Sequence, residues 1–373
     1  MEKLIFRKFI YDVFIFFLLT SISITLIVWV IQAVNYLDFI SEDGHSFQVY
    51  FLYILLTLPK LYGNIVIFSF FISIFYTLSK YQDNNEILIF WANGISKIQF
   101  VNVILKFSLI MFILQILLNF FIVPKTQDMA RSYIRTSNID YLPSLIKPKQ
   151  FIDTVEDLTI FVEKKNKNGV LENILLKDQF NKKDSQIITA KKGFIIKKNN
   201  TNYLILQDGK IINIDGKDSN IFKFDKTEFN LSKHTTKTTT YPKIQEINSY
   251  TLFSCLKSFI EFNKGFKLIN FSCDDRSINP TIQELFKRTF AQFYVVVVSL
   301  VGSALLIINK DNFKFNIFKL ILFLFGISLV IIKEFNIQYL DYYSNLNYLS
   351  ASMPIFFFLT IYLCLIFNLK FVK

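Results

Sequence analysis

The chain has 373 residues, of which 52% are hydrophobic and 19% are charged, and its formal net charge is +12. Phe occupies 44 positions, whereas Gly occupies 10 and Cys three. This composition excludes a disordered chain, a collagen and a small disulfide-stabilised scaffold, which need few apolar residues, many glycines or many cysteines. Lys supplies nearly all of the positive charge in a chain that is also rich in Asn and Ile. The positive charge is therefore explained by a general enrichment of the chain in Lys, and no nucleic-acid partner is expected.

Six apolar runs are each long enough to cross a membrane, because a helix spans the ~30 Å hydrocarbon core with about 20 residues. Three precede and three follow a polar middle segment, at about 10–34, 49–79, 99–123, 286–308, 315–335 and 351–369. The first run follows Lys3, Arg7 and Lys8, but it is too long for a signal peptide and lacks a small-residue cleavage site. The sequence therefore predicts an α-helical membrane protein with six transmembrane helices in a 3+3 arrangement.

Basic residues accumulate on one side of the six predicted spans. They occur before the first span, in the loops after the second and fourth, and after the sixth: Lys3, Arg7, Lys8, Lys80, Lys97, Lys310, Lys314, Lys319, Lys370 and Lys373. The other side carries the acidic residues Asp38, Glu42, Asp43 and Asp341. Because short cytoplasmic loops are enriched in Lys and Arg, both termini are predicted to be cytoplasmic. The middle segment is then outside, in the periplasm where the cell has one.

The middle segment, about 125–285, is predicted to form an inserted all-β domain with flanking linkers. Short β-rich runs alternate in it with turn signals, among them Asp208-Gly209 and Asp215-Gly216. An Asp-Gly pair between two apolar runs is a strong hairpin signal, so Asp208-Gly209 is predicted to be a two-residue hairpin loop. Many short strands with regular turns favour a sandwich, an open barrel or a jelly roll. The predicted domains are 1–124, 125–285 and 286–373.

Residues that carry catalysis or metal binding are sparse. The chain has no GxxxxGK[ST] phosphate-binding loop and no serine nucleophile elbow. His45 and His234 are its only histidines, and Cys255, Cys273 and Cys364 form no CxxC pair. The favoured interpretation of the cysteines is small hydrophobic side chains or spare thiols. The sequence therefore predicts that the chain is not an enzyme and has no metal site and no cofactor.

The loop between the second and third runs contains the most informative segment, Thr77–Lys97. Asp83 or Asn84 is predicted to cap a short helix at about 84–93. Gly94 is predicted to end that helix, because glycine readily takes the left-handed conformation of a helix C-terminus.

One apolar face of this short helix would consist of Ile87, Phe90 and Trp91, and Glu86 lies in its first turn. Two interpretations remain open. The helix is either an anchor in the membrane interface or a coupling helix that docks into a groove of a cytoplasmic motor protein. In the second case, Glu86 would accept an Arg or Lys from the partner.

The segment Thr77–Ser96 resembles the lipopolysaccharide-export permease family LptF/LptG (YjgP/YjgQ). That family has a pattern of the form T-L-G-K-L-x-x-x-x-E-[IL]-x-x-x-x-A-x-G-[LIF]-[ST], which this sequence matches at Thr77, Leu78, Lys80, Glu86, Ile87, Ala92, Gly94 and Ser96. Pro59 in the second run and the stretch Glu284–Arg288 at the start of the fourth are similar to the family as well. The resemblance covers essentially the whole chain and leans towards LptF. Gln32 departs from the family pattern, because family members commonly have a basic residue at that position near the outer end of the first span.

The resemblance implies a permease subunit of an ABC-type exporter, which extracts lipopolysaccharide from the bacterial inner membrane and passes it to a periplasmic bridge. The β domain would then be a periplasmic jelly roll. A separate cytoplasmic ABC ATPase dimer would hydrolyse ATP. The other implied partners are a second homologous permease subunit, which would be LptG-like, and a membrane-anchored accessory protein.

Two groups of site residues follow. Those implied for ATPase coupling are Glu86, Ile87, Phe90, Trp91, Ala92 and Gly94. Those considered for a lipid path or gate are Gln32, Lys60, Lys333 and Glu334, because polar and charged groups inside a membrane are costly and often functional. Lys333 and Glu334 could instead form an internal pair or reach the membrane surface.

Three other classes are less consistent with the sequence. A membrane sensor or receptor with an extracytoplasmic β domain would need a cytoplasmic output module, and the predicted cytoplasmic loops are short. A membrane enzyme would need carboxylates, histidines or metal ligands clustered at one membrane face. A lipoprotein-release permease would carry its large domain after the first of four spans.

Overall fold

Two compact units make up the chain. The computed structural model describes residues 2–37, 46–136, 148–155, 158–166, 169–179, 184–198, 201–215, 218–231, 243–262, 267–268, 271–340 and 347–371. A helical unit consists of Met1–Ile31, Leu56–Asp128 and Pro242–Lys373, and a second unit, the β unit, consists of Gln32–Leu55 and Met129–Tyr241. The predicted domain limits at residues 124 and 285 remain predictions. Residues named above that lie outside the described ranges are Asp38, Glu42, Asp43, His45, Gly216, His234, Asp341 and Lys373.

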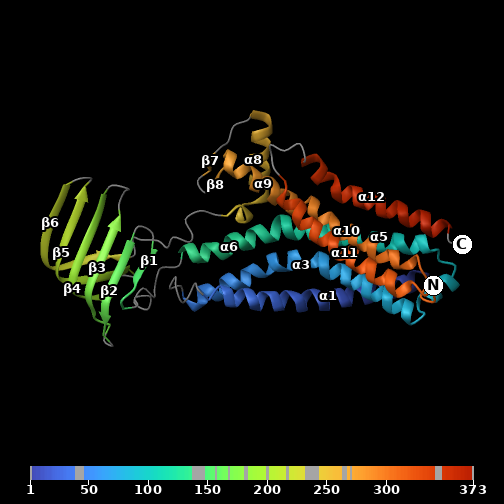
Figure 1. Cartoon of the computed structure of the whole chain (residues 1–373), viewed down its shortest axis with the longest axis horizontal. Helices are drawn as coiled ribbons and strands as arrows, with labels where there is room; N and C mark the ends of the chain where they lie inside the picture. Colours follow the sequence, from blue (N-terminus) through green and yellow to red (C-terminus); the bar gives the residue numbers. More distant parts are fainter. Residues whose placement is uncertain are drawn as a thin grey trace. The chain divides into compact units, whose positions relative to one another are not determined.

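Six helical stretches among the described residues are long and apolar enough to cross a membrane, which confirms the predicted spans. The first two stretches are α1 (Glu2–Asn35) and α3 (Phe47–Asp83), and the third consists of α5 (Lys97–Leu117), the π-helix η1 (Leu118–Ile122) and α6 (Val123–Thr136). The fourth consists of α9 (Asp275–Arg288), η4 (Phe290–Phe293), α10 (Tyr294–Ser303) and η5 (Ala304–Leu306). The last two are α11 (Phe315–Gln338) and α12 (Asn347–Phe371). Apolar runs of this length become helices because a helix satisfies its own backbone hydrogen bonds in the absence of water. Figure 1 shows these helices running alongside one another.

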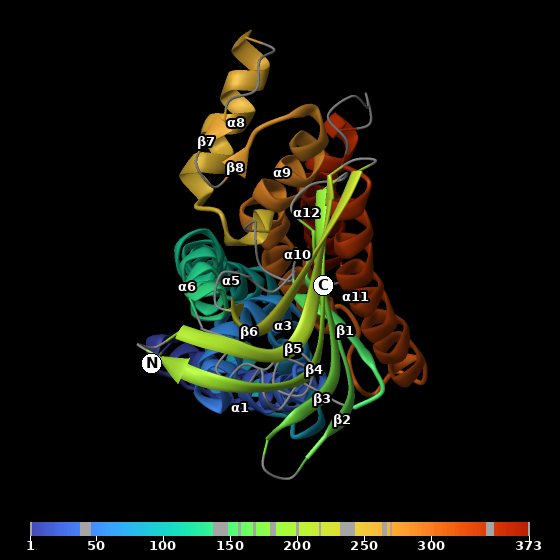
Figure 2. The ribbon, with the colours of Figure 1, turned by 90° about the vertical axis from the view of Figure 1, so that its left-hand side faces the viewer.

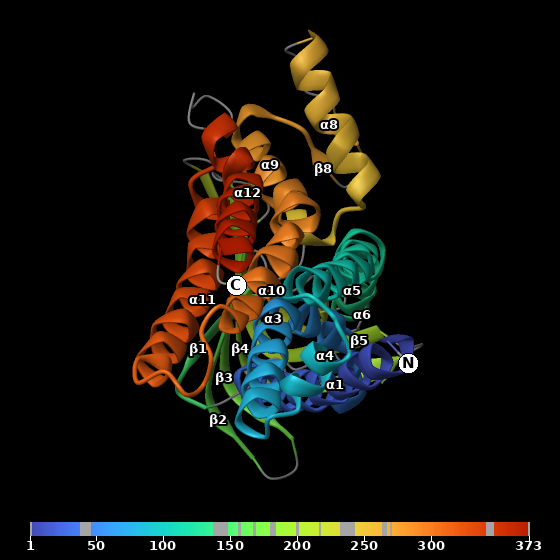
Figure 3. The same ribbon diagram turned by 90° about the vertical axis from the view of Figure 1, so that its right-hand side faces the viewer.

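Helix α10 is enclosed by the other helices of its unit, as Figure 3 shows. All ten of its residues are buried, and it packs against α5, α11 and α12. Gly326 of α11 lies so close to α3 that a Cβ atom would meet the ring of Phe71 at 2.0 Å. On α1, in contrast, Leu19 and Ile27 are about three-fifths exposed. Such exposed apolar side chains suit a lipid environment, because lipid tails are as apolar as Leu.

A six-stranded antiparallel sheet in the β unit confirms the predicted inserted β domain (Figure 2). Its strands are β1 (Phe151–Val155), β2 (Leu158–Lys165), β3 (Leu171–Gln179), β4 (Asp184–Lys198), β5 (Thr201–Asp215) and β6 (Asp218–Asn230). Alternating residues such as Leu158, Ile160 and Val162 are buried on one face, as the period of two along a strand dictates. Each described strand pairs with its neighbours in sequence, so these strands form a meander, without the crossovers of a jelly roll.

The predicted hairpin at Asp208-Gly209 is wrong, because β5 continues straight through both residues. Asp208 has a φ of 53°, and Gly209 stays in register with Ala190 on β4 and Phe224 on β6. A Cβ atom on Gly209 would lie 2.3 Å from the ring of Phe224, so the glycine makes room for that ring. The Asp-Gly pair therefore marks a close side-chain approach within a continuous strand, which is another common use of glycine in a strand.

The two cysteines in the segment after the sheet form a disulfide, which corrects the expectation of spare thiols. Cys255 lies in α8 (Ser249–Phe262), and Cys273 lies just before α9. Between them, β7 (Lys267–Leu268) pairs with β8 (Phe271–Ser272). Spacing along the sequence cannot show this pair, because bonding requires the two Cα atoms to be brought close by the fold.

Candidate functional site

The loop between α3 and α5 contains the predicted short helix, but it begins later than expected. Helix α4 spans Ile87–Ala92, and its N-cap is Glu86, which makes no side-chain capping bond. Asn84 Nδ2 instead donates a hydrogen bond to Glu86 Oε1 at 3.1 Å. The predicted cap at Asp83 or Asn84 is therefore wrong, because α3 continues to Asp83 and Asn85 then turns the chain with a φ of 60°.

The end of α4 follows the prediction. Gly94 has a φ of 77°, and the N–H of Ile95 donates to the Phe90 carbonyl at 3.1 Å. This pairing is that of a Schellman C-terminus. Ser96 then caps α5 by accepting from the N–H of Gln99 at 3.2 Å, and Gln99 Oε1 accepts from the N–H of Ser96 at 2.9 Å. The Gly-x-Ser part of the segment is thus explained by turn and cap chemistry.

The apolar face predicted for docking is turned towards the protein's own core. Ile87 is 6% exposed and Phe90 is 1% exposed. The ring of Phe90 lies 5.5 Å from Phe6 of α1 and 4.9 Å from Phe100 of α5. Trp91 is half-buried, with its ring 6.1 Å from Phe100. These side chains fasten α4 to α1 and α5. The sequence could not reveal the contact with α1, because that helix is distant from α4 in the chain.

The apolar side chains that α4 exposes are Leu88 and Ile89, at 58% and 53%. Ala92 is exposed beside them, and the side chain of Glu86 is 30% exposed. Sequence reasoning assigned the helix a single apolar face and missed this pair. The signal was present, because five consecutive apolar residues from Ile87 to Trp91 must cover more than one face of a helix.

Charged and polar bonds hold the end of α3 next to this loop. Tyr81 donates to Asp12 of α1 at 2.6 Å, and Gln82 Nε2 donates to the Leu305 carbonyl at 2.8 Å. At the rim, Lys319 Nζ lies 3.6 Å from Asp83 Oδ2. Lys8 Nζ lies 4.0 Å from Glu86 Oε2, with 70% of the Lys8 side chain exposed. Glu86 is therefore only loosely paired and is accessible to a partner.

A second polar cluster surrounds Arg288, the last residue of α9. Its side chain is 2% exposed. Nε donates to Glu284 Oε1 at 2.9 Å, and Nη2 donates to the Gln245 carbonyl at 3.0 Å. Nη1 donates to the Ile247 carbonyl at 2.9 Å and to Ser249 Oγ at 2.8 Å. The sequence placed Arg288 in a family pattern, but its partners could not be inferred.

Of the residues considered for a lipid path, Lys60 contacts this same region. Its Nζ donates to Gln245 Oε1 at 2.7 Å, and Gln245 belongs to η3 (Ile244–Glu246). Glu284 and Lys287 are near enough to act on it electrostatically. Lys60 therefore already has a polar partner within the chain.

The other candidates have separate partners. Lys333 is buried, and its Nζ lies 2.8 Å from Glu334 Oε1, so the internal pair considered above forms. Glu334 is 55% exposed. Gln32, which belongs to the β unit, donates from Nε2 to the hydroxyl of Tyr36 at 3.3 Å. Whether any of these residues meets lipid remains a prediction.

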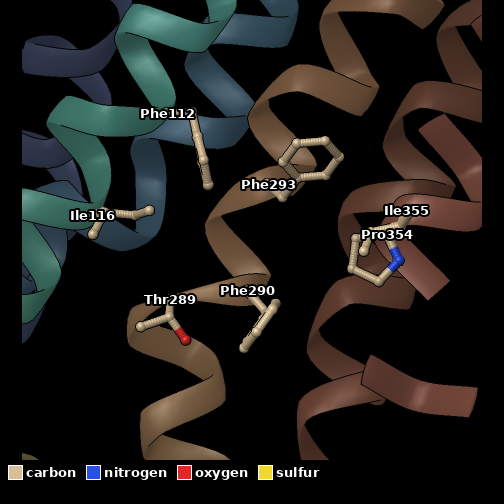
Figure 4. A pocket seen from close by; sticks show the side chains of 7 residues that line it. All are labelled: Phe112, Ile116, Thr289, Phe290, Phe293, Pro354 and Ile355. Carbon is tan, nitrogen blue, oxygen red and sulfur yellow. The ribbon is translucent and has the colours of Figure 1, made fainter. Parts of the chain in front are cut away.

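An apolar groove of about 340 Å³ lies between α5, η4 and α12 (Figure 4). Its lining residues are Phe112, Ile116, Thr289, Phe290, Phe293, Pro354 and Ile355. Two breaks in helical regularity coincide with the groove. The chain leaves α-helical geometry at Thr289, and Pro354 removes a backbone donor from α12. The groove exposes almost only carbon atoms, as a site for hydrocarbon would.

Metal ligands do not cluster in the described residues, where no group of three or more His, Cys, Asp or Glu side chains could hold an ion. The described features with potential function are the loop around Glu86, the cluster around Arg288 and the apolar surfaces between the spans.

Comparison with known proteins places these features in a family. The family described as "Lipopolysaccharide export system permease LptF/LptG" matches residues 7–368. An uncharacterized protein of Rickettsia prowazekii (strain Madrid E) is 23% identical over 191 residues, which are 51% of this chain and 53% of that protein. The chain thus spans about half the length of this curated relative. Because the family match extends over nearly the whole chain, including both sets of spans and the β sheet, the protein belongs to the LptF/LptG family of lipopolysaccharide export system permeases.

Proposed function

We propose that this chain is a permease subunit of an ABC-type exporter that extracts lipopolysaccharide from the inner membrane and passes it to a periplasmic bridge. The family match over residues 7–368 carries this proposal. The subunit itself would be non-catalytic, LptF-like, and paired with an LptG-like subunit and a membrane-anchored accessory protein. Both termini would be cytoplasmic and the β unit periplasmic, as the distribution of Lys and Arg in the short loops predicts.

The ATPase dimer of this exporter would dock at the loop around α4. Glu86 is accessible there and can accept an Arg or Lys, while Leu88 and Ile89 offer exposed apolar contact. Phe90 joins α4 to the aromatic side chains of α1 and α5. A displacement of α4 would therefore move α1 and α5 with it, which is how a rigid element converts nucleotide-driven closure into movement of the spans.

The transported lipid would use the apolar surfaces of the spans. Lipopolysaccharide carries several acyl chains and a phosphorylated headgroup, so its path needs hydrocarbon walls and a cationic mouth. Lys60 and Lys333 are the cations proposed for the headgroup, with Glu334 as the carboxylate that pairs with Lys333. Gln32 is the proposed polar residue near the outer end of the first span.

Replacement of Glu86 by Ala tests this function. In proteoliposomes that contain the complete complex, E86A is expected to lower ATP-dependent lipopolysaccharide release about ten-fold or more, because loss of a charged contact at an interface costs about 2 kcal/mol or more. The matched control is D311A, which removes another exposed carboxylate in a predicted cytoplasmic loop. Normal release by E86A with an intact complex would show that the loop does not couple to an ATPase.

A further inference from the structure

The β sheet is joined to the helical unit by an exit and a return of the chain. The exit consists of η1 and α6, which continue directly from α5. The return passes through η3 into α8. Any force between the spans and the sheet that travels along the chain must pass through these two stretches.

The exit contains a carbonyl that its own helix cannot satisfy in the ordinary way. Pro124 follows Phe120 by four residues and has no N–H to donate to the Phe120 carbonyl. Ser249 supplies the missing donor, because its Oγ donates to that carbonyl at 2.6 Å. Ser249 is fully buried, and the hydrogen bond itself is partly buried. The exit and the return are therefore tied directly to each other.

Arg288 ties the same pair to the fourth span. Of the four hydrogen bonds that the Arg288 guanidinium donates, three go to the return segment, at Gln245, Ile247 and Ser249. The fixed fork of a guanidinium can hold several acceptors at once, which a lysine ammonium on a flexible stem cannot reproduce. Because a buried charge or carbonyl without a partner is costly, this arrangement resists separation of its parts.

We propose that Arg288, Ser249 and the Phe120 carbonyl form a coupling node that makes the third and fourth spans move together with both chain connections of the β sheet. The proposal rests on the proposed function, because an exporter must transmit span movements to its extracytoplasmic domain. Arg288 and Ser249 act as positioning residues in this node. Neither needs to touch the transported lipid or the ATPase.

The test compares S249A and R288K with S254A in the complete complex reconstituted in proteoliposomes with fluorescent lipopolysaccharide. Ser254 is the matched control, since among the described residues its hydroxyl donates to the Tyr250 carbonyl of its own helix. The measured quantity is lipid released per ATP hydrolysed. S249A is expected to lower this ratio about three-fold and R288K about ten-fold, while ATP hydrolysis stays within about two-fold of wild type.

Three outcomes distinguish the alternatives. A ratio for S249A and R288K equal to that of S254A would overturn the node. An equal loss of hydrolysis and release in S249A, with a lowered Tm, would also overturn it, because the role would then be purely structural. If R288K fails to fold, the ratio of lipid released to ATP hydrolysed by S249A still decides whether the node exists. Absence of ATP-dependent release by the wild-type complex would reject the proposed function itself.

Discussion

The helical unit contains two clusters of opposite construction, one around Arg288 and one around Glu86. Around Arg288 the charged group is buried and every described bond is internal. Around Glu86 the aromatic side chains are buried and the charges lie at the surface. A buried polar network fixes geometry, because any rearrangement leaves groups without partners. A rim of loosely paired charges over a rigid aromatic base can exchange its partners. The first arrangement suits a joint inside the protein, and the second suits a contact with another protein.

The largest expected effect is a difference in the free energy of unfolding between a variant of the Arg288 cluster and a variant of the Glu86 cluster. R288A should lower the free energy of unfolding by about 3–5 kcal/mol, because it removes the guanidinium from Glu284 and from the buried carbonyls. E86A should change it by less than about 0.5 kcal/mol, as surface substitutions usually do. Denaturant unfolding in detergent measures both. K287A, next to Arg288 in the chain, is the matched control, and similar losses for R288A and K287A would contradict the contrast.

A second, intermediate effect concerns the exposed residues of α4. If the proposed ATPase docks at α4, the double variant L88S/I89S should weaken its association about ten-fold without changing the Tm, because the two side chains are exposed and few interface residues carry most binding energy. Binding of purified ATPase to the permease in nanodiscs measures the affinity. I221S, which alters an exposed apolar residue of β6, serves as the control. Unchanged affinity in L88S/I89S would place the docking surface elsewhere.

The smallest effect is expected at the rim. K319A removes the ion pair with Asp83, whose side chain is 56% exposed, so the loss of stability should be about 0–1 kcal/mol. Unfolding at low and at high salt should show a difference between K319A and wild type that shrinks as salt rises. A loss of more than about 2 kcal/mol would mean that the rim contributes to the fold much as the Arg288 cluster does.

Local patterns were sufficient for much of the architecture. Long apolar runs predicted the six spans, and short β-rich runs separated by turn signals predicted the inserted β domain. Gly94 was recognised as a helix end because the left-handed conformation is intrinsic to that residue type. Such features depend on residues close together in the chain.

Long-range features could not be predicted in the same way. The buried face of α4 depends on Phe6 of α1, and the role of Arg288 depends on carbonyls about 40 residues earlier in the chain. At Asp208-Gly209 the local turn signal was overridden by pairing with two neighbouring strands and by the ring of Phe224. In each case the deciding partner is distant in sequence, so no local rule could supply it.

The Cys255–Cys273 disulfide adds a redox step to the maturation of this membrane protein. Intrachain disulfides form and persist in oxidising compartments, which agrees with the extracytoplasmic placement proposed above for the segment that carries both cysteines. Closing a loop across 18 residues contributes about 3 kcal/mol by restricting the unfolded chain. The bond encloses α8 beyond Cys255 and the β7–β8 pair, directly before the helix that ends at Arg288. Cells that fail to oxidise this pair would insert the same six spans but leave the approach to the fourth span less firmly ordered.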